Sequence, residues 1–279
     1  MEFFTHVDIQ DFPATISLSD RIMVLGSCFA DNIGSRLKSA GFDVCVNPFG
    51  TLYNPASICK AAARMDSAEP FTEADCVEMG AGAGLICSYS HHTSFARPSA
   101  EEFLENANAR LAEASSFWKS CNKLIVTFGT ALVWRHDGEA VSNCLKRPAA
   151  GFTRDMLGTE EVQTYIQCLL SYGKETILTV SPIRHMADGA HVNTISKSTL
   201  LLAADRADGG CYFPAYELVM DELRDYRFYA EDMCHPNATA VQFVWERFLD
   251  AAAIPSERET IRANEKAARR SAHRSILNK

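Results

Sequence analysis

Apolar runs alternate along the chain with stretches of helical periodicity. Buried strands are predicted for five short apolar runs, at 22–26, 43–46, 123–129, 176–182 and 211–213. Helices are predicted between and after them, at 31–40, 55–65, 100–119, 159–171, 194–206 and from about 237 onward. Because strand and helix alternate, the pattern predicts an α/β fold with three layers, α/β/α, around a parallel five-stranded sheet.

The predicted strand order is the flavodoxin-like winding 2-1-3-4-5. In such a sheet the ligand lies at the carboxyl ends of the strands, where the winding reverses between strands 1 and 3. Ser27 follows the first predicted strand, and Gly129-Thr130 ends the third. Both positions are therefore expected at the ligand-binding edge.

Two stretches depart from the alternation. Residues 67–98 predict a small inserted hairpin, and residues 256–279 are polar and charged. The last stretch, which includes Lys266, Arg269, Arg270 and Arg274, predicts a solvated terminal helix or a frayed tail. We expect residues 1–255 to form a single domain.

Charge and composition restrict the partners. The 279 residues are 47% hydrophobic and 22% charged, with a net charge of −8, which argues against a nucleic-acid or anionic-membrane binder. No apolar run reaches the roughly 18–20 residues of a membrane span. The acidic first twelve residues do not resemble a secretory signal. The ten cysteines form no CxxC pair, so we expect reduced thiols and a cytoplasmic protein.

Two motifs carry candidate chemistry. Gly26-Ser27-Cys28-Phe29-Ala30 places a serine between a strand and a helix, where it can act as a nucleophile or simply cap the helix. Cys28 is a rival nucleophile at the next position. Far downstream, Asp232 and His235 stand three residues apart, as a general base and the carboxylate that orients it would.

The sequence resembles the GSCFA family, named for the pentapeptide at 26–30, within the wider SGNH/GDSL-type hydrolase group. The resemblance spans roughly residues 15–250, in blocks that read NPFGTLYNPASI at 47–58, HHTSF at 91–95, TFGTALVW at 127–134, TVSPIRH at 179–185 and DELRDYRFYAEDMCHPN at 221–237. It implies a three-layer hydrolase fold with Ser27 as the nucleophile and Asp232–His235 as the catalytic pair.

The oxyanion hole is expected to use the Ser27 amide and donors from two other loops. Gly50 looks like the group's second-block glycine, although it would serve equally well as a turn residue after Pro48. Many group members carry an asparagine after the third strand, where this chain has Gly129-Thr130. The Thr130 hydroxyl is the expected replacement, with Asn143 as the next choice.

Three further polar residues are weaker candidates for substrate binding. His185 closes the fourth strand, His92 lies on the inserted segment, and Asn143 lies in a loop. Arg184 could pair with an anionic substrate group or with the acidic run at 221–225, and the acidic run is the expected partner. A metal site built from His91, His92, His185, Cys234 and His235 is the alternative, but none of these residues has a metal-binding spacing.

The sequence therefore predicts a serine esterase that needs neither metal nor cofactor. Its expected substrate is a small-molecule or glycan ester, with an O-acyl group on a carbohydrate-like alcohol. A ligand-binding module without turnover and an acyltransferase are the alternatives. The missing asparagine motivates the binding module, and an acyltransferase would use the same serine as the esterase.

Overall fold

A parallel sheet of five strands lies at the centre of the protein. The computed structural model describes residues 4–277, with side chains up to residue 271. In spatial order the parallel strands are β2 (Asp43–Val46), β1 (Arg21–Gly26), β5 (Lys123–Phe128), β9 (Glu175–Val180) and β10 (Cys211–Tyr212). This order is the predicted flavodoxin-like winding, and the predicted fold class is confirmed.

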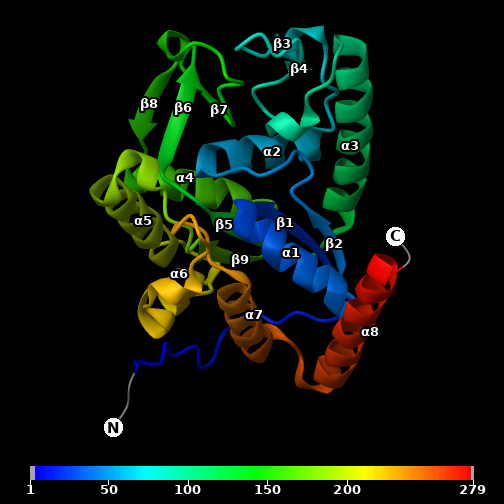
Figure 1. Ribbon diagram of the computed structural model, residues 1–279, viewed down its shortest axis with the longest axis vertical. Coiled ribbons are helices and arrows are strands. Elements are labelled where there is room, and N and C mark those ends of the chain that lie inside the picture. Colours follow the sequence, from blue (N-terminus) through cyan, green and yellow to red (C-terminus); the bar gives the residue numbers. More distant parts are fainter. Residues whose placement is uncertain (1–3, 278–279) are drawn as a thin grey trace.

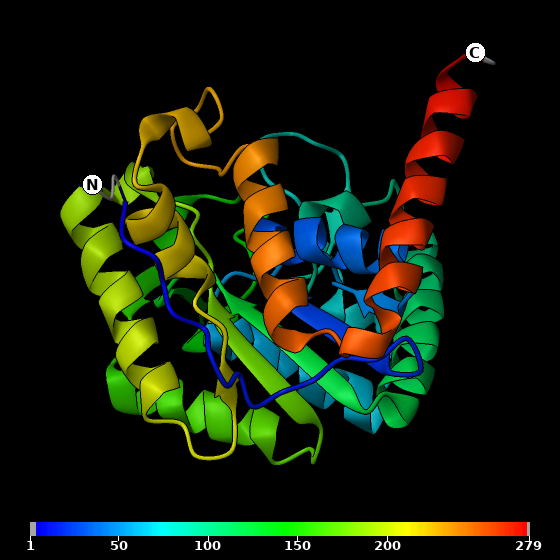
Figure 2. The same ribbon diagram turned by 90° about the horizontal axis from the view of Figure 1, so that it is seen from below.

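Helices cover both faces of the sheet (Figures 1 and 2). One face packs against α2 (Pro55–Ser67), α3 (Ala100–Ser120), α4 (Thr159–Leu170) and α5 (Ala190–Asp205). The other packs against α1 (Cys28–Ala40), α7 (Ala238–Ala252) and α8 (Arg258–Leu277). Successive side chains of β1 point to opposite faces of the sheet. Met23 and Leu25 pack in the core under α2 to α5, and Ile22 and Val24 pack in the core under α1, α7 and α8.

A second sheet was not predicted. Its three antiparallel strands, in the order β7-β6-β8, are β6 (Leu132–His136), β7 (Glu139–Val141) and β8 (Thr153–Met156). The turn between β6 and β7 is Asp137-Gly138, with φ of 49° and 82°. Two left-handed residues in succession are what a tight two-residue hairpin requires. The sheet follows β5 and therefore stands beside the carboxyl edge of the central sheet.

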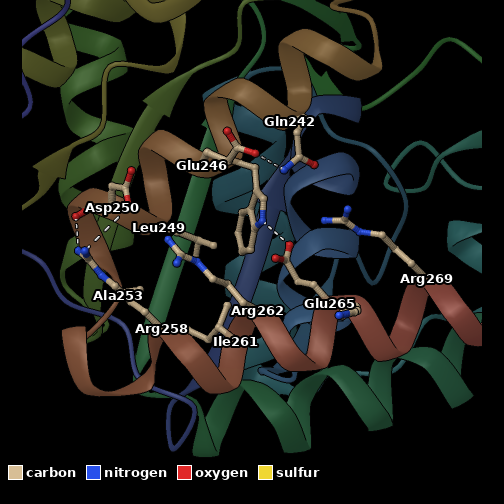
Figure 3. A pocket seen from close by; sticks show the side chains of 12 residues that line it. Gln242, Glu246, Leu249, Asp250, Ala253, Arg258, Ile261, Arg262, Glu265 and Arg269 are labelled. Carbon is tan, nitrogen blue, oxygen red and sulfur yellow. Dashed lines mark hydrogen bonds and ion pairs between the residues drawn. The ribbon is translucent and has the colours of Figure 1, made fainter.

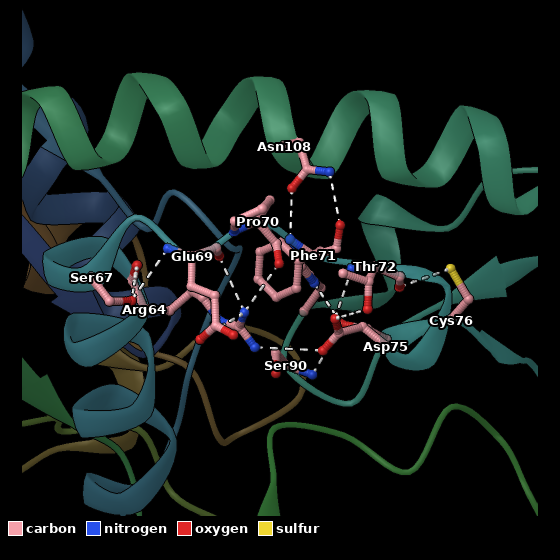
Figure 4. Close-up of polar contacts among 12 residues, drawn as sticks. Arg64, Ser67, Glu69, Pro70, Phe71, Thr72, Asp75, Cys76, Ser90 and Asn108 are labelled. Carbon is pink, nitrogen blue, oxygen red and sulfur yellow. Dashed lines mark hydrogen bonds and ion pairs between the residues drawn. The ribbon is translucent and has the colours of Figure 1, made fainter.

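The inserted segment contains a two-stranded antiparallel pair, β3 (Val77–Glu78) and β4 (Ile86–Cys87). Asn108 of α3 fastens it, because its side chain accepts the Phe71 amide at 2.8 Å and donates to the Phe71 carbonyl at 3.0 Å (Figure 4). Arg64 lies over the Phe71 ring at 4.5 Å and pairs with Asp75 at 3.5 Å. These contacts hold the insertion against α2 and α3.

The last helix, α8, packs on α1 and α7. Ile261 is 1% exposed, the Asn264 amide donates to Ala40 O at 2.9 Å, and Trp245 Nε1 donates to Glu265 at 2.8 Å. A cavity of about 530 Å³ lies between α7 and α8 (Figure 3). The stretch predicted as solvated thus buries one side. The Arg274 side chain and residues 278–279 lie outside the described part of the chain.

Two expectations from the composition concern membrane spans and the cysteines. None of the helices between residues 4 and 277 has the length and the apolar run that a membrane crossing requires. All ten cysteines are free thiols in the structure.

His91 is a fully buried histidine in the inserted segment. Its Nδ1 lies 2.7 Å from Ser88 Oγ, and its ring is in contact with four aromatic rings, those of Phe49, Phe71, Phe95 and Phe103. Burial, and to a smaller extent the Arg64 charge, lower the pKa of His91 to about 3. The native state therefore holds this ring neutral, whereas the unfolded chain takes up a proton at a higher pH.

We expect this histidine to weaken the fold in mild acid. Between the unfolded pKa of about 6.5 and the native value of about 3, the unfolded state binds the extra proton, so His91 lowers the free energy of unfolding by roughly 1.4 kcal/mol per pH unit as pH falls. In denaturant titrations from pH 7 to 5, His91→Gln should reduce this slope by about 1 kcal/mol per pH unit on average, because the unfolded histidine is only partly protonated near pH 7. The exposed His191→Gln is the control, and an equal slope in the His91 variant would contradict the assignment.

Candidate active site

A cavity of about 480 Å³ opens at the carboxyl edge of the central sheet. Five of the eight residues expected to catalyse, to bind the oxyanion or to bind substrate line it: Ser27, Thr130, His185, Asp232 and His235. They come from the ends of three parallel strands and from the loop before α7. The second sheet supplies another part of the wall, which contains Leu132, Trp134, Val141, Ser142 and Arg154. Residues far apart in the sequence thus converge where the winding reverses.

Ser27 leaves β1 through a backbone turn that only glycine can make. Gly26 has a φ of 142°, and a Cβ atom there would lie 2.2 Å from Thr127 O. Ser27 then caps α1, its Oγ accepting the Phe29 amide at 3.3 Å. The residue is 1% exposed, and its hydroxyl has no hydrogen bond to His235 in the structure. Ser27 therefore does cap α1, which was the alternative role for this residue.

Asp232 and His235 form a close pair. His235 Nδ1 lies 2.6 Å from Asp232 Oδ2, so the ring donates its Nδ1 proton to the carboxylate and keeps Nε2 free as a base. The amides of His235 and Cys234 each donate to Asp232 Oδ1 at 2.9 Å. These amide bonds, together with the His235 ring, lower the pKa of Asp232 to about 2. The carboxylate is ionised at neutral pH, and it orients the imidazole.

Arg184 anchors the loop that carries this pair. Its amide donates to Cys234 O at 3.0 Å, and its guanidinium donates to Met233 O at 2.9 Å. The same guanidinium lies 5.5 and 5.6 Å from the ring centres of Tyr226 and Tyr229. The expected pairing of Arg184 with the acidic run at 221–225 is wrong, because the guanidinium binds the Met233 carbonyl and forms no ion pair with a described carboxylate.

The backbone amides expected to bind an oxyanion have acceptors inside the protein. Ser27 N donates to Thr127 O at 3.2 Å, and Gly50 N donates to Asn47 O at 2.8 Å. The Thr130 hydroxyl oxygen accepts the Leu132 amide at 3.0 Å and lies 3.0 Å from Ser196 Oγ. If Ser196 donates that bond, the Thr130 proton remains free for a ligand.

Asn54 is a lining residue that the sequence analysis missed. Its Oδ1 accepts the Ser57 amide at 2.8 Å and caps α2, which fixes the orientation of the side-chain amide. Nδ2 is then left to face the cavity that Asn54 lines. The Cys28 amide, in the first turn of α1, donates to no residue that the structure describes. The signal available for Asn54 was Asn-Pro before a helical pattern, which indicates a cap rather than a site.

Three predicted residues lie outside the lining of this cavity: Gly50, His92 and Asn143. A Cβ atom at Gly50 would lie 2.3 Å from His92 Cβ, so this glycine allows the insertion to pack closely. His92 Nδ1 accepts the Ser94 amide at 3.2 Å and caps a short turn. Asn143 accepts the Leu145 amide at 2.7 Å and donates to His91 O. All three hold loops together.

The Cys28 thiol also lines the cavity. Burial, with a smaller contribution from the Asp31 charge, raises its pKa above the ordinary value. A raised pKa reduces the thiolate fraction that a cysteine nucleophile needs. Among the side chains described, those of residues 4–271, no three from His, Cys, Asp or Glu gather into a group that could hold a metal ion.

The family assignment follows from a comparison with known protein families. The model of the GSCFA family matches residues 21–248. This chain belongs to the GSCFA family. Neither the curated proteins nor the solved structures contain a significant match to it. In this GSCFA protein, the matched region contains the family pentapeptide and the loop with Asp232 and His235.

We expect Arg184→Met to loosen the loop of this GSCFA protein without unfolding it. The substitution removes the bond to Met233 O and the contact with the two tyrosine rings, while the Arg184 amide bond to Cys234 O remains. Hydrogen exchange at the Ala230 amide, which donates to His235 O at 2.7 Å, should accelerate about tenfold. Exchange in the core strand β5 should change little, and an unchanged Ala230 rate would contradict the anchoring role.

Proposed function

We propose that this protein is a serine hydrolase of the SGNH type that cleaves an ester. The observation that carries the proposal is the 2.6 Å contact between His235 and an ionised Asp232, on the same cavity that Ser27 lines. A hydroxyl, a base and an orienting carboxylate are the components of serine acyl hydrolysis.

The reaction proceeds in two halves. Ser27 Oγ attacks the ester carbonyl carbon while His235 Nε2 takes the hydroxyl proton, and Asp232 stabilises the imidazolium. Collapse of the tetrahedral intermediate breaks the bond to the alcohol, which leaves with the proton from His235. Water then attacks the acyl-enzyme with His235 again as base, and this step releases the acid and restores Ser27.

The oxyanion is the part of the proposal that departs most from the group's pattern. Three donors face or adjoin the cavity without a required internal acceptor: the Cys28 amide, Asn54 Nδ2 and the Thr130 hydroxyl. Asn54 supplies the type of group that the segment after β5 lacks. We assign the oxyanion to these donors, and we assign to Ser27 N and Gly50 N a role in holding the loops.

The alcohol part of the ester is proposed to be carbohydrate-like. The second sheet brings Trp134 to the cavity, with the Arg154 guanidinium 4.9 Å from its ring centre. Arg154 forms a bidentate ion pair with Asp188, in which Arg154 Nη2 lies 2.6 Å from Asp188 Oδ2. An aromatic face beside a paired, neutralised set of polar groups suits a polyhydroxylated, uncharged ligand.

A ligand-binding module without turnover is the second candidate. Two observations favour it. The Ser27 and Gly50 amides already donate to carbonyls inside the protein, and the described Ser27 and His235 side chains form no hydrogen bond with each other. Catalytic hydrogen bonds are often long without substrate, so the hydrolase remains our proposal.

A fluorophosphonate probe separates the two candidates. We expect the probe to label the wild-type protein at Ser27, because His235 activates that hydroxyl, and Ser27→Ala to abolish labelling. Cys28→Ala is the matched control one residue away and should still be labelled. Mass spectrometry of the labelled peptide provides the measurement. Labelling that survives in Ser27→Ala would transfer the nucleophile elsewhere, and an unlabelled wild type would favour the binding module.

A second prediction tests Asn54. Asn54→Asp and Asn54→Ser both keep an acceptor for the Ser57 amide at the start of α2, but both remove the side-chain N–H donor. If Nδ2 binds the oxyanion, kcat/KM for an aryl acetate should fall about 10²–10³-fold in each variant, with little change in the denaturation midpoint. Thr130→Val measures the other side-chain donor. A wild-type rate in both Asn54 variants would remove Asn54 from the mechanism.

A further inference from the structure

Lys197 of α5 is a buried cation next to the candidate active site. The residue is 1% exposed, and its Nζ donates to Gly129 O and to Ser181 O, each at 2.6 Å. These carbonyls follow β5 and β9 at the carboxyl edge of the sheet. No described carboxylate forms an ion pair with Lys197, and burial lowers its pKa to about 7. A buried ammonium without a counter-ion is expensive, so its retention calls for a role.

His185 shares one of these acceptors. Its Nε2 lies 3.2 Å from Gly129 O, and because a carbonyl can only accept, Nε2 carries the proton. The His185 amide donates to Asn193 Oδ1 at 2.9 Å, which holds the residue in place. Burial, followed by the Lys197 charge, lowers the pKa of His185 to about 4. The ring is therefore neutral at physiological pH, and its other nitrogen, Nδ1, is an acceptor.

The Nδ1 atom has no hydrogen-bond partner among the residues that the structure describes, and His185 lines the same cavity as Ser27. We propose that Lys197 is a positioning residue: its ammonium holds the Gly129 carbonyl that takes the His185 Nε2 proton, and its charge opposes protonation of the ring, so that Nδ1 accepts a hydrogen bond from a hydroxyl group of the ester substrate. The substrate contact rests on the proposed hydrolase function. It defines the substrate as an ester with a free hydroxyl near the reacting carbonyl.

Several other groups act on these two residues. Cys28 of α1 raises the pKa of Lys197 slightly against the effect of burial. The Lys197 ammonium lies 6.0 Å from the Tyr216 ring of α6 (Ala215–Glu217). Asp188 raises the pKa of His185, and His235 lowers it, both less than Lys197 does. Since Asp188 is paired with Arg154, Lys197 is the main charge that acts on the His185 ring.

Nitrogen NMR of histidine-labelled protein tests the positioning role without any substrate. The His185 signals are assigned by their loss in His185→Gln. In the wild type they should report a proton on Nε2 and a neutral ring down to about pH 4. Lys197→Met and Lys197→Gln both remove the charge, so the pKa of His185 should rise by about one unit in each. Gln can still donate to the strand carbonyls, which provides a second variant if Met impairs folding.

The substrate contact is tested with two matched esters, ethylene glycol monoacetate and 2-methoxyethyl acetate, which differ in one hydroxyl donor. The wild type should prefer the hydroxyl ester about five- to tenfold in kcat/KM, as one hydrogen bond allows. His185→Phe should abolish the preference, because kcat/KM for the hydroxyl ester should fall to the value for the methoxy ester.

Each result decides a different part of the proposal. An unchanged His185 pKa in both Lys197 variants, or a proton on Nδ1 in the wild type, would overturn the positioning role. Equal rates for the two esters in the wild type, or a preference that persists in His185→Phe, would overturn the hydroxyl contact. If no ester were turned over in a Ser27-dependent way, the proposed function and the contact would both fail, whereas the titration would still decide the role of Lys197.

Discussion

The close approach of three chain segments at the carboxyl edge of the sheet is the constraint on which the site depends. Gly26 passes against Thr127 O, and a Cβ atom at Gly129 would lie 3.3 Å from Ser27 Cβ and 3.0 Å from Tyr53 O. Tyr53 O in turn accepts the amides of Gly129 and Thr130. A side chain on either glycine would separate these segments, so the direction of Ser27, the start of α1 and the cavity wall are specified together.

Much of this arrangement follows from the sequence. The three central strands, β1, β5 and β9, were predictable because they are buried on both faces and therefore appear as apolar runs, as in residues 123–128. The parallel winding then brings Ser27 and Thr130 to one edge. The pairing of Ser27 with Asp232 and His235 was different in kind. It came from the family resemblance, because no local pattern relates residues so far apart.

The missed features share a physical cause, which is that their partners are backbone carbonyls or amides. In the sequence, Lys197 looks like part of the polar face of a helix, yet its ammonium binds two carbonyls that directly follow β5 and β9. Arg184 binds a loop carbonyl instead of an acidic side chain. Asn54 uses its Oδ1 atom to cap a helix, which leaves Nδ2 for the cavity. Residue patterns encode burial and charge but carry little information about which carbonyl a side chain reaches. The second sheet is an exception, since Asp137-Gly138 was a readable hairpin signal.

The second sheet has a consequence for how the family can vary. Residues 132–156 contribute to the cavity wall, whereas Ser27, Asp232 and His235 belong to the edge of the central sheet and the loop before α7. The wall and the proposed reacting groups therefore lie on separate stretches of chain, and one can change without the other. If the proposed function holds, we expect a graft of these strands between two family members to exchange ligand preference as a module, in the way that loops are exchanged between antibodies.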